Sequence, residues 1–213
     1  MKRALDLFCG AGGASKGLHR AGYEVCGIDI HEQPNYPFHY EIGDATSITT
    51  ELLREFDFVW ASPPCQAFTA YKRRKNHVKK YPNYIPRVRK MLKAAGVPYV
   101  IENVPGAPLQ NPVTLCGSMF LLNVRRHRIF ETNFPVKQPK CRHELQTPRF
   151  PPATNRKNKR KTVEVGVWRI PLEVQQHAMG INWMNVKELS QAIPPVYAEY
   201  IARQLTPTPG GSG

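Results

Sequence analysis

The feature that most constrains the fold is a regular alternation of short apolar segments and helix-like segments through the first half of the chain. Five segments have the character of buried strands: residues 3–8, 23–30, 39–48, 57–62 and 98–104. Helices are expected between them, about ten residues long after a glycine-rich turn near residue 10, and then over 49–56 and 81–96. This alternation predicts an α/β fold with a mostly parallel sheet.

The second half of the chain follows a different pattern. Residues 124–134 alternate like an extended segment, and residues 135–161 are basic and proline-rich without a helical period. We interpret the latter as a small extended lobe. Helices are expected again at 171–181 and 194–205, the second with proline in its first turn.

Positive charge is concentrated in two segments. The formal net charge is +14, and residues 72–90 hold nine Lys or Arg residues and no acid. Residues 137–161 hold nine more with one acid, Glu144. Because affinity for nucleic acid grows with each phosphate that a basic side chain neutralises, two such segments favour a nucleic-acid partner. Solvated loops with spare lysines would give the same pattern.

Composition argues against several other classes of protein. Hydrophobic residues make up 41% of the chain, enough for a packed core. No apolar run approaches the roughly 20 residues of a membrane span, and we expect no signal peptide. The five cysteines include no Cys-x-x-Cys pair, so we expect neither a zinc site nor a disulfide framework. Reduced thiols in a cytoplasmic protein are expected instead.

A glycine-rich turn follows the first predicted strand. Its glycines are Gly10, Gly12, Gly13 and Gly17. Small residues there let a ligand approach the backbone N–H groups of a helix N-terminus, but the spacing differs from the dinucleotide pattern and disfavours NAD. Asp29, at the tip of the second strand, is placed for ribose hydroxyls, and Asp44, after the third, for an adenine amino group. These points suit a nucleoside cofactor without pyrophosphate, such as S-adenosylmethionine.

A cysteine and an acid form a second group of candidate residues. Cys65 follows Pro63 and Pro64 on a stiffened turn after the fourth strand, and a cysteine that only fills a core does not need such a turn. Glu102 ends the fifth strand at the same predicted edge of the sheet, so the thiol and the carboxyl should face each other across a cleft. The pair predicts nucleophilic attack with proton donation, although a single glutamate is more often a surface or salt-bridge residue.

Two arginines follow on the next extended segment. Arg126 and Arg128 are two residues apart, so in an extended backbone they would point to one face. There they could hold an anion or a carbonyl oxygen, although arginines on a protein surface are common.

Four motifs in this order resemble those of the DNA (cytosine-5) methyltransferases. They are DLFCGAGGASKGL, SPPCQ, ENV and RRHRIF. The resemblance covers about residues 2–130 and resumes more weakly over 171–205. It implies a Rossmann-like, S-adenosylmethionine-dependent methyltransferase sheet with a small, mostly irregular basic recognition lobe. The implied activity is methyl transfer to C5 of a cytosine flipped out of double-stranded DNA.

The resemblance also implies a role for each matching residue. Cys65 is similar to the nucleophile that adds to C6, and Glu102 to the residue that favours protonation of N3. Arg128, and also Arg126, resemble the Arg-x-Arg pair near the base. Asn103 resembles the residue that holds the nucleophile loop. The implied cofactor-binding residues are Phe8, Gly10, Gly12, Gly13, Asp29, Ile30, Asp44, Ala45, Pro64, Gln191 and Ala192. The chemistry calls for a thiolate at Cys65, and hence for a pKa lowered by a basic environment.

The resemblance divides the chain into four parts. A catalytic and cofactor-binding domain is expected over 1–134, a reduced target recognition lobe over 135–168, helices that return to the first domain over 169–205, and a flexible tail over 206–213. The small lobe predicts a short, degenerate recognition sequence with contacts weighted to phosphates. The chain departs from the family at Gln191, where asparagine is usual.

Two other functions stay open. The same motifs occur in relatives that act on tRNA, so RNA is an alternative substrate. Gln191 and the small lobe would also fit a catalytically weak nucleic-acid-binding protein with this fold. In each case we expect a monomer without a metal, in a bacterial cytoplasm or encoded by a phage, with restriction–modification among its candidate roles.

Overall fold

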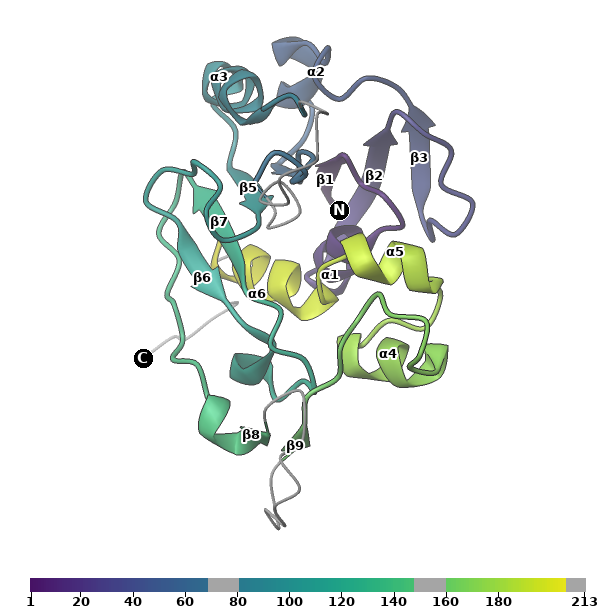
Figure 1. Ribbon diagram of the computed structural model, residues 1–213. Coiled ribbons are helices and arrows are strands. Elements are labelled where there is room, and N and C mark those ends of the chain that lie inside the picture. The colour runs from purple at the N-terminus through teal and green to yellow at the C-terminus, as the bar shows by residue number, and fades with distance from the viewer. Residues whose placement is uncertain (69–80, 148–159, 206–213) are drawn as a thin grey trace.

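A seven-stranded sheet forms the centre of the protein (Figure 1). The computed structural model describes residues 1–68, 81–147 and 160–205. The strands of this sheet are β1 (Lys2–Leu7), β2 (Tyr23–Asp29), β3 (His39–Ile42), β4 (Phe58–Ala61), β5 (Tyr99–Asn103), β6 (Val113–Leu115) and β7 (Arg128–Thr132). Their order is β3-β2-β1-β4-β5-β7-β6, in which β7 runs antiparallel to both of its neighbours and the other neighbouring pairs are parallel. The order reverses between β1 and β4, where open α/β sheets bind ligands.

Helices cover both faces of the sheet (Figure 1). They are α1 (Gly13–Arg20), α2 (Thr50–Arg54), α3 (Ile85–Ala95), α4 (Leu172–Met179), α5 (Val186–Gln191) and α6 (Pro195–Leu205). Helices α1 and α6 pack on one face, and α2 and α3 on the other. Helix α3 begins with a proline in its first turn and ends at Gly96, whose φ of 72° suits glycine. Asn185 and Glu188 start α5 with a capping box.

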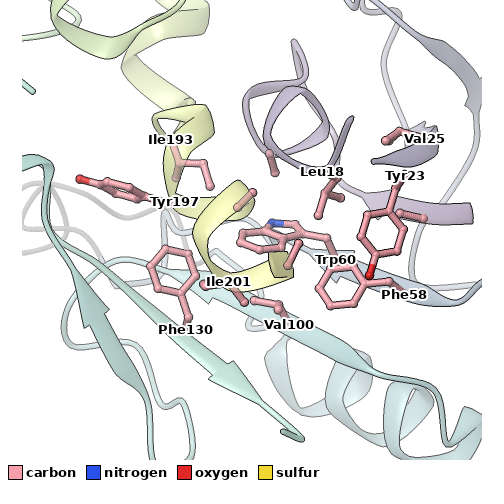
Figure 2. Packing of buried hydrophobic residues seen from close by; sticks show 14 of the residues in the cluster. Leu18, Tyr23, Val25, Phe58, Trp60, Val100, Phe130, Ile193, Tyr197 and Ile201 are labelled. Carbon is pink, nitrogen blue, oxygen red and sulfur yellow. The ribbon is translucent and has the colours of Figure 1, made fainter. Parts of the chain in front are cut away.

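The two faces of the sheet are built from alternating residues of the same strands. In β4, Phe58 and Trp60 pack under α1 and α6, whereas Val59 and Ala61 face α2 and α3. Figure 2 shows Trp60 beside Leu18 of α1 and Ile201 of α6. Trp60 is fully buried, so truncation to alanine would cost about 3–5 kcal/mol.

Helices α1 and α6 approach each other closely. A Cβ on Gly17 would lie 2.1 Å from the carbonyl oxygen of Pro195, so only glycine permits this packing. The C-terminal helix therefore lies directly against the helix that follows the glycine-rich turn, which brings residues near 192 to the turn itself.

The expected strands and helices of the first half are confirmed, with ends that differ by a few residues. The third strand is shorter than expected and ends at Ile42, before Asp44. Three elements were not predicted: β6, α5, and a two-stranded sheet of β8 (Gln146–Thr147) and β9 (Arg160–Lys161). Short 3-10 helices, η2 (Gly117–Phe120) and η3 (His143–Leu145), complete the described elements.

The two basic segments lie largely outside the described residues. Ten of their eighteen basic residues fall within 69–80 and 148–159. In the described part, Arg87 donates to the carbonyl oxygen of Thr46, and Arg89 pairs with Glu131 at 2.7 Å. These two arginines of α3 are therefore engaged in the fold. Among the described helices, none combines the length and apolar character that crossing a membrane requires.

Candidate active site

The turn that carries Cys65 is fixed by the ends of three neighbouring strands. The side-chain amide of Asn103, the last residue of β5, donates to the carbonyl oxygen of Pro63 at 2.9 Å. The backbone N–H of Ser62 donates to the carbonyl oxygen of Leu7 at 3.0 Å, and the indole N–H of Trp60 donates to the Ser62 hydroxyl at 3.0 Å. Asn103 thus makes the contact expected of a residue that holds this loop. The Cys65 thiol is half-buried at this edge of the sheet.

Glu102 and Arg128 form a buried ion pair beside the thiol. Glu102 is 8% exposed, and its Oε1 lies 3.1 Å from Nε of Arg128, the first residue of β7. Burial raises the pKa of the Glu102 carboxyl, although the nearby arginines oppose the rise. The carboxyl therefore keeps a proton more readily than an exposed glutamate, as a proton donor must.

The pKa of the Cys65 thiol is raised, whereas the sequence predicts that it is lowered. Burial, and then the negative charge of Glu102, raises the pKa of Cys65 above its ordinary value, and the arginines only partly offset this. The expected lowering of the pKa by basic neighbours is therefore wrong for the free protein. The main reason is that the thiol is partly buried, and the charge of Glu102 adds to the rise more than either arginine subtracts from it.

Arg126 has different bonding partners from Arg128. It has a φ of 37° and precedes the strand, so the extended backbone assumed for the pair is wrong. Its guanidinium donates to the carbonyl oxygens of Leu189, Ser190 and Ala192, at 2.7–3.1 Å. These carbonyls end α5, so Arg126 caps that helix and places the segment that follows it. The structure brings Cys65, Glu102 and Arg128 together, and Arg126, which contacts the end of α5, lies near enough for its charge to act on the thiol and on the carboxyl.

The glycine-rich turn presents a single glycine to open space. Among the described residues, nothing lies within 4 Å of where a Cβ on Gly10 would be. A Cβ on Gly12 would meet the Tyr36 ring at 3.0 Å, and one on Gly13 would meet the carbonyl oxygen of Ile193 at 2.7 Å. Gly12 and Gly13 are thus required by packing, whereas Gly10, with a φ of 48°, leaves room for a ligand above the turn.

Asp29 braces this turn. Its Oδ2 accepts from the backbone N–H of Gly10 at 3.0 Å, and its Oδ1 accepts from the N–H of His31 at 3.0 Å. Because each carboxylate oxygen has two lone pairs, further hydroxyl donors can still bind. Ile30 follows with 61% of its side chain exposed, which leaves an apolar surface beside the carboxylate.

Asp44 lies next to Asp29 across the strand ends. The N–H of Gly43 donates to the carbonyl oxygen of Asp29 at 2.9 Å. The exposed Asp44 carboxylate accepts from the backbone and hydroxyl of Thr46, both at 2.8 Å, and from Ser47. These hydrogen bonds lower the pKa of Asp44, so it is an anionic acceptor. Ala45 is buried beneath it.

The remaining candidates lie around the turn or the thiol. Ala192 approaches Gly13, at 3.3 Å from a Cβ built there, and Gln191 beside it is exposed. Phe8, with a φ of 60°, lies against the ring of Tyr84 at 6.5 Å between centroids. Pro64 is half-buried in the Cys65 turn. The candidate cofactor residues therefore come from the ends of β1, β2, β3 and β4 and from the end of α5.

A buried polar network beneath the turn was missed from the sequence. Asp6 of β1 hydrogen-bonds the Ser15 hydroxyl, which lies 2.8 Å from the hydroxyl of Tyr36. Burial raises the pKa of Asp6 to about 7. The available signal was an acid in the middle of the apolar segment RALDLF. Trp183 adds a second support, because its indole N–H donates to the carbonyl oxygen of Ala11 at 2.8 Å.

A cluster of possible metal ligands lies at the same edge of the sheet, beside β6 and β7. Cys116, His127, Cys141 and His143 each offer one ligand atom, and these four atoms lie within 4.8 Å of one another. The expectation of no metal site depended on local cysteine spacing, which does not test a group assembled from distant segments. All five cysteines are described, and all are free thiols.

Comparisons with known proteins agree with this geometry. The family model for C-5 cytosine-specific DNA methylases matches residues 2–112. The Type II methyltransferase M.AgeI of Thalassovita gelatinovora is 30% identical over 120 residues, which are 49% of this chain and 28% of that protein. M.AquIA, a Type II methyltransferase of Picosynechococcus sp., is 32% identical over 169 residues, or 64% of this chain and 68% of that protein. The chain thus spans only part of each relative.

A solved structure extends the similarity to nearly the whole fold. The Entamoeba histolytica methyltransferase EhMeth aligns with 97% of this chain and 99% of its own, with a TM-score of 0.58 and 12% sequence identity. At that identity the similarity concerns the fold alone.

Proposed function

Because the chain belongs to the C-5 cytosine-specific DNA methylase family, we propose that it methylates C5 of cytosine in double-stranded DNA, with S-adenosylmethionine as the methyl donor. The observation that carries this proposal is the half-buried Cys65 thiol beside the Glu102–Arg128 ion pair at the ends of β4, β5 and β7. A nucleophile and a protonated acid at one strand edge are the two groups that activation of a cytosine ring requires.

In the proposed reaction, the sulfur of Cys65 forms a bond to C6 of the base. The C5=C6 electron pair shifts to the C4–C5 bond and the C4=N3 pair moves onto N3, which takes a proton from Glu102, so that no negative charge builds up on the base. C5 then has enamine character. S-adenosylmethionine supplies an electrophilic methyl group when it is bound. Loss of the C5 proton to a base then restores the C5=C6 double bond as the thiolate leaves, and N3 returns its proton to Glu102.

The raised pKa values of Cys65 and Glu102 fit this sequence of events. Burial raises the pKa of both groups, and the negative charge of Glu102 adds to the rise at Cys65, so both groups keep a proton more readily than they would in water. When Glu102 is protonated, its repulsion of a thiolate disappears. The reactive state is therefore a neutral Glu102 beside an ionised Cys65, and Arg128 lies close enough to favour that thiolate.

S-adenosylmethionine would bind above Gly10, the turn glycine that faces open space. Asp29 would accept hydrogen bonds from ribose hydroxyls, and Asp44 from the adenine amino group. Ile30 offers an exposed apolar surface for the adenine ring. Binding of the target base requires its extrusion from the duplex, because C6 is inaccessible within the base stack.

The partner and the location are part of the same proposal. Double-stranded DNA is the proposed partner, since the formal net charge of +14 favours a polyanion and the matched relatives are named Type II methyltransferases. We propose a bacterial cytoplasmic setting, for which the five free thiols are suitable.

A mechanism-based trap tests the proposal. Duplex DNA containing 5-fluorocytosine, incubated with the protein and S-adenosylmethionine, should give a covalent protein–DNA adduct that survives denaturation. The adduct should be absent in Cys65→Ala and unchanged in Cys26→Ala, whose thiol lies in β2 away from this edge. An adduct that persists without Cys65 would refute the nucleophile. An adduct with fluorinated tRNA but none with DNA would assign RNA as the substrate.

A further inference from the structure

Two cysteines and two histidines from three separate segments converge beside the recognition lobe. Cys116 follows β6, His127 precedes β7, and Cys141 and His143 lie in the segment after β7. Cys116 is buried, both histidines are half-buried, and Cys141 is exposed. The four ligand atoms lie within 4.8 Å of one another, which is close enough for one ion to contact all of them.

Two sulfur–nitrogen distances in the cluster are close to those of a tetrahedral site. Sγ of Cys116 lies 3.2 Å from Nε2 of His143, and Sγ of Cys141 lies 3.6 Å from Nε2 of His127. In a tetrahedral zinc site, bonds of about 2.3 Å to sulfur and about 2.0 Å to nitrogen place these atoms about 3.6 Å apart. The two imidazole rings lie close together, with centroids 5.1 Å apart and planes at 86° to each other.

We propose that Cys116, His127, Cys141 and His143 bind a structural zinc ion that fixes the start of the recognition lobe to the catalytic sheet. Two thiolates and two imidazoles form a ligand set that zinc prefers over magnesium or calcium. Because all four positions are supplied by the protein, the ion would have no open position for water or substrate. Its role is therefore structural, and the site is separate from the methyl-transfer chemistry.

A hydroxyl group holds the sulfur of Cys116 next to the segment that supplies Cys141 and His143. Ser118 Oγ lies 3.2 Å from this sulfur and also accepts from the backbone N–H of Arg142 at 3.0 Å. Such outer contacts orient metal ligands, and this one joins the two segments that supply them.

The backbone also brings the ligands together. Leu115 pairs with Arg128 across β6 and β7, so the next residue of one strand and the preceding residue of the other, Cys116 and His127, are neighbours (Figure 1). A Cβ on Gly117 would lie 2.2 Å from the carbonyl oxygen of Val124, so only glycine allows this close turn. Two of the four ligands are thereby placed by the sheet itself.

The recognition segment needs such an anchor because it has little core of its own. From 135 to 146, where every residue is described, Gln146 alone is buried. Small lobes that cannot bury enough apolar surface are commonly held by metals or disulfides. His127 also adjoins Arg128 in sequence, so the ion would link the recognition lobe to the strand that carries the partner of Glu102.

Metal analysis of the full-length protein, purified without chelator and in the presence of zinc, tests the proposal. We expect about one zinc per chain in the wild type and in Cys26→Ala. Cys141→Ser should retain less than about a fifth of this zinc. The exposed position of Cys141 makes it suitable for substitution. Stoichiometric zinc that persists in Cys141→Ser would overturn the ligand assignment.

A spectroscopic test needs no substitution. Wild-type protein stripped of metal and titrated with Co²⁺ should show the visible absorption of tetrahedral cobalt together with a thiolate-to-metal charge-transfer band, both saturating at one equivalent. Absence of zinc combined with absence of this spectrum would overturn the proposal. So would a Cys116–Cys141 disulfide found by non-reducing mass spectrometry in the protein as purified, before any metal is removed. None of these results depends on methyl transfer, so the zinc site and the proposed activity can fail separately.

Discussion

Two thiols at the same edge of the sheet have opposite surroundings. Cys65 faces the carboxyl of Glu102, and burial together with that carboxyl raises the pKa of the thiol. Cys116 faces the imidazoles of His127 and His143, and its hydrogen bonds, which outweigh burial, lower its pKa to about 6. The first thiol is half-buried and the second is buried, so exposure does not explain the difference.

The comparison shows that the neighbours of a thiol determine its chemistry more than its position in the fold does. A thiol beside an acid stays protonated until a substrate rearranges the charges, which suits a nucleophile that must not react with other electrophiles. A thiol beside two imidazoles ionises more readily than an ordinary cysteine and can bind a soft or borderline cation. Substitutions at the two sites should therefore have different consequences.

The largest expected effect comes from removing the reactive thiol. Cys65→Ala should lower the rate of methyl transfer at least about 1,000-fold, because no other group can form the bond to C6. Cys26→Ala, the matched loss of a half-buried thiol elsewhere, should leave the rate unchanged. Single-turnover transfer of a radiolabelled methyl group to duplex DNA measures both. A Cys65→Ala protein with more than a tenth of wild-type activity would contradict the distinction between the two thiol sites.

Removal of the acid should have the next largest effect. Glu102→Gln keeps the size of the side chain but cannot supply a proton to N3, so the rate should fall about 100- to 1,000-fold. Asp44→Asn is a suitable comparison, because Asp44 is exposed and belongs to the cofactor side. It should raise the KM for S-adenosylmethionine and change kcat little. Equal effects of both substitutions on kcat would argue against a separate role for Glu102.

Substitution of Arg128 should mainly lower activity, whereas substitution of Arg126 should mainly lower stability. Arg128→Met removes the partner of Glu102 and should lower kcat about 10- to 100-fold by misplacing the acid. Arg126→Met leaves three carbonyl oxygens at the end of α5 without their donor and should lower the unfolding free energy by about 2–3 kcal/mol. Denaturant unfolding and kcat at saturating cofactor measure the two effects. A larger loss of kcat in Arg126→Met than in Arg128→Met would reverse this assignment.

Local pattern was sufficient to predict the architecture of the first half. Strands such as β4 are continuous apolar segments that end in turn residues, and the helices between them carry their own start and stop signals, such as Gly96. Elements of three to six residues, β6 and α5, were missed because they are too short to show a period. Their positions depend on tertiary contacts, above all on the cap that Arg126 provides for α5.

The position of a site residue could be predicted where that residue ends a strand. It could not be predicted where it depends on local backbone geometry or on contacts between distant segments. Cys65 and Glu102 follow from their strand ends. The separation of Arg126 from Arg128 depends on a φ of 37°, which sequence does not reveal. The Cys116 cluster combines ligands with ten and thirteen residues between them, so spacing rules for metal sites did not find it. The raised pKa of Cys65 depends on which charge lies nearest.

The smallest expected effect is also the most direct measure of the surroundings of Cys65. Iodoacetamide reacts with the thiolate, so alkylation of Cys65 in the free protein should be slow near about pH 7 and should accelerate as the pH rises, because its pKa is raised. Glu102→Gln removes the negative charge that contributes to this rise. Alkylation of Cys65 should then be about threefold to tenfold faster near neutral pH, although the same substitution slows methyl transfer.

Peptide mass spectrometry resolves the cysteines in one digest. Cys26, whose pKa is raised chiefly by its own burial, serves as the internal control, and its alkylation rate should not change. A Cys65 that reacts no faster in Glu102→Gln would show that burial alone protects the thiol, and the contrast with Cys116 would then be one of packing rather than of charge.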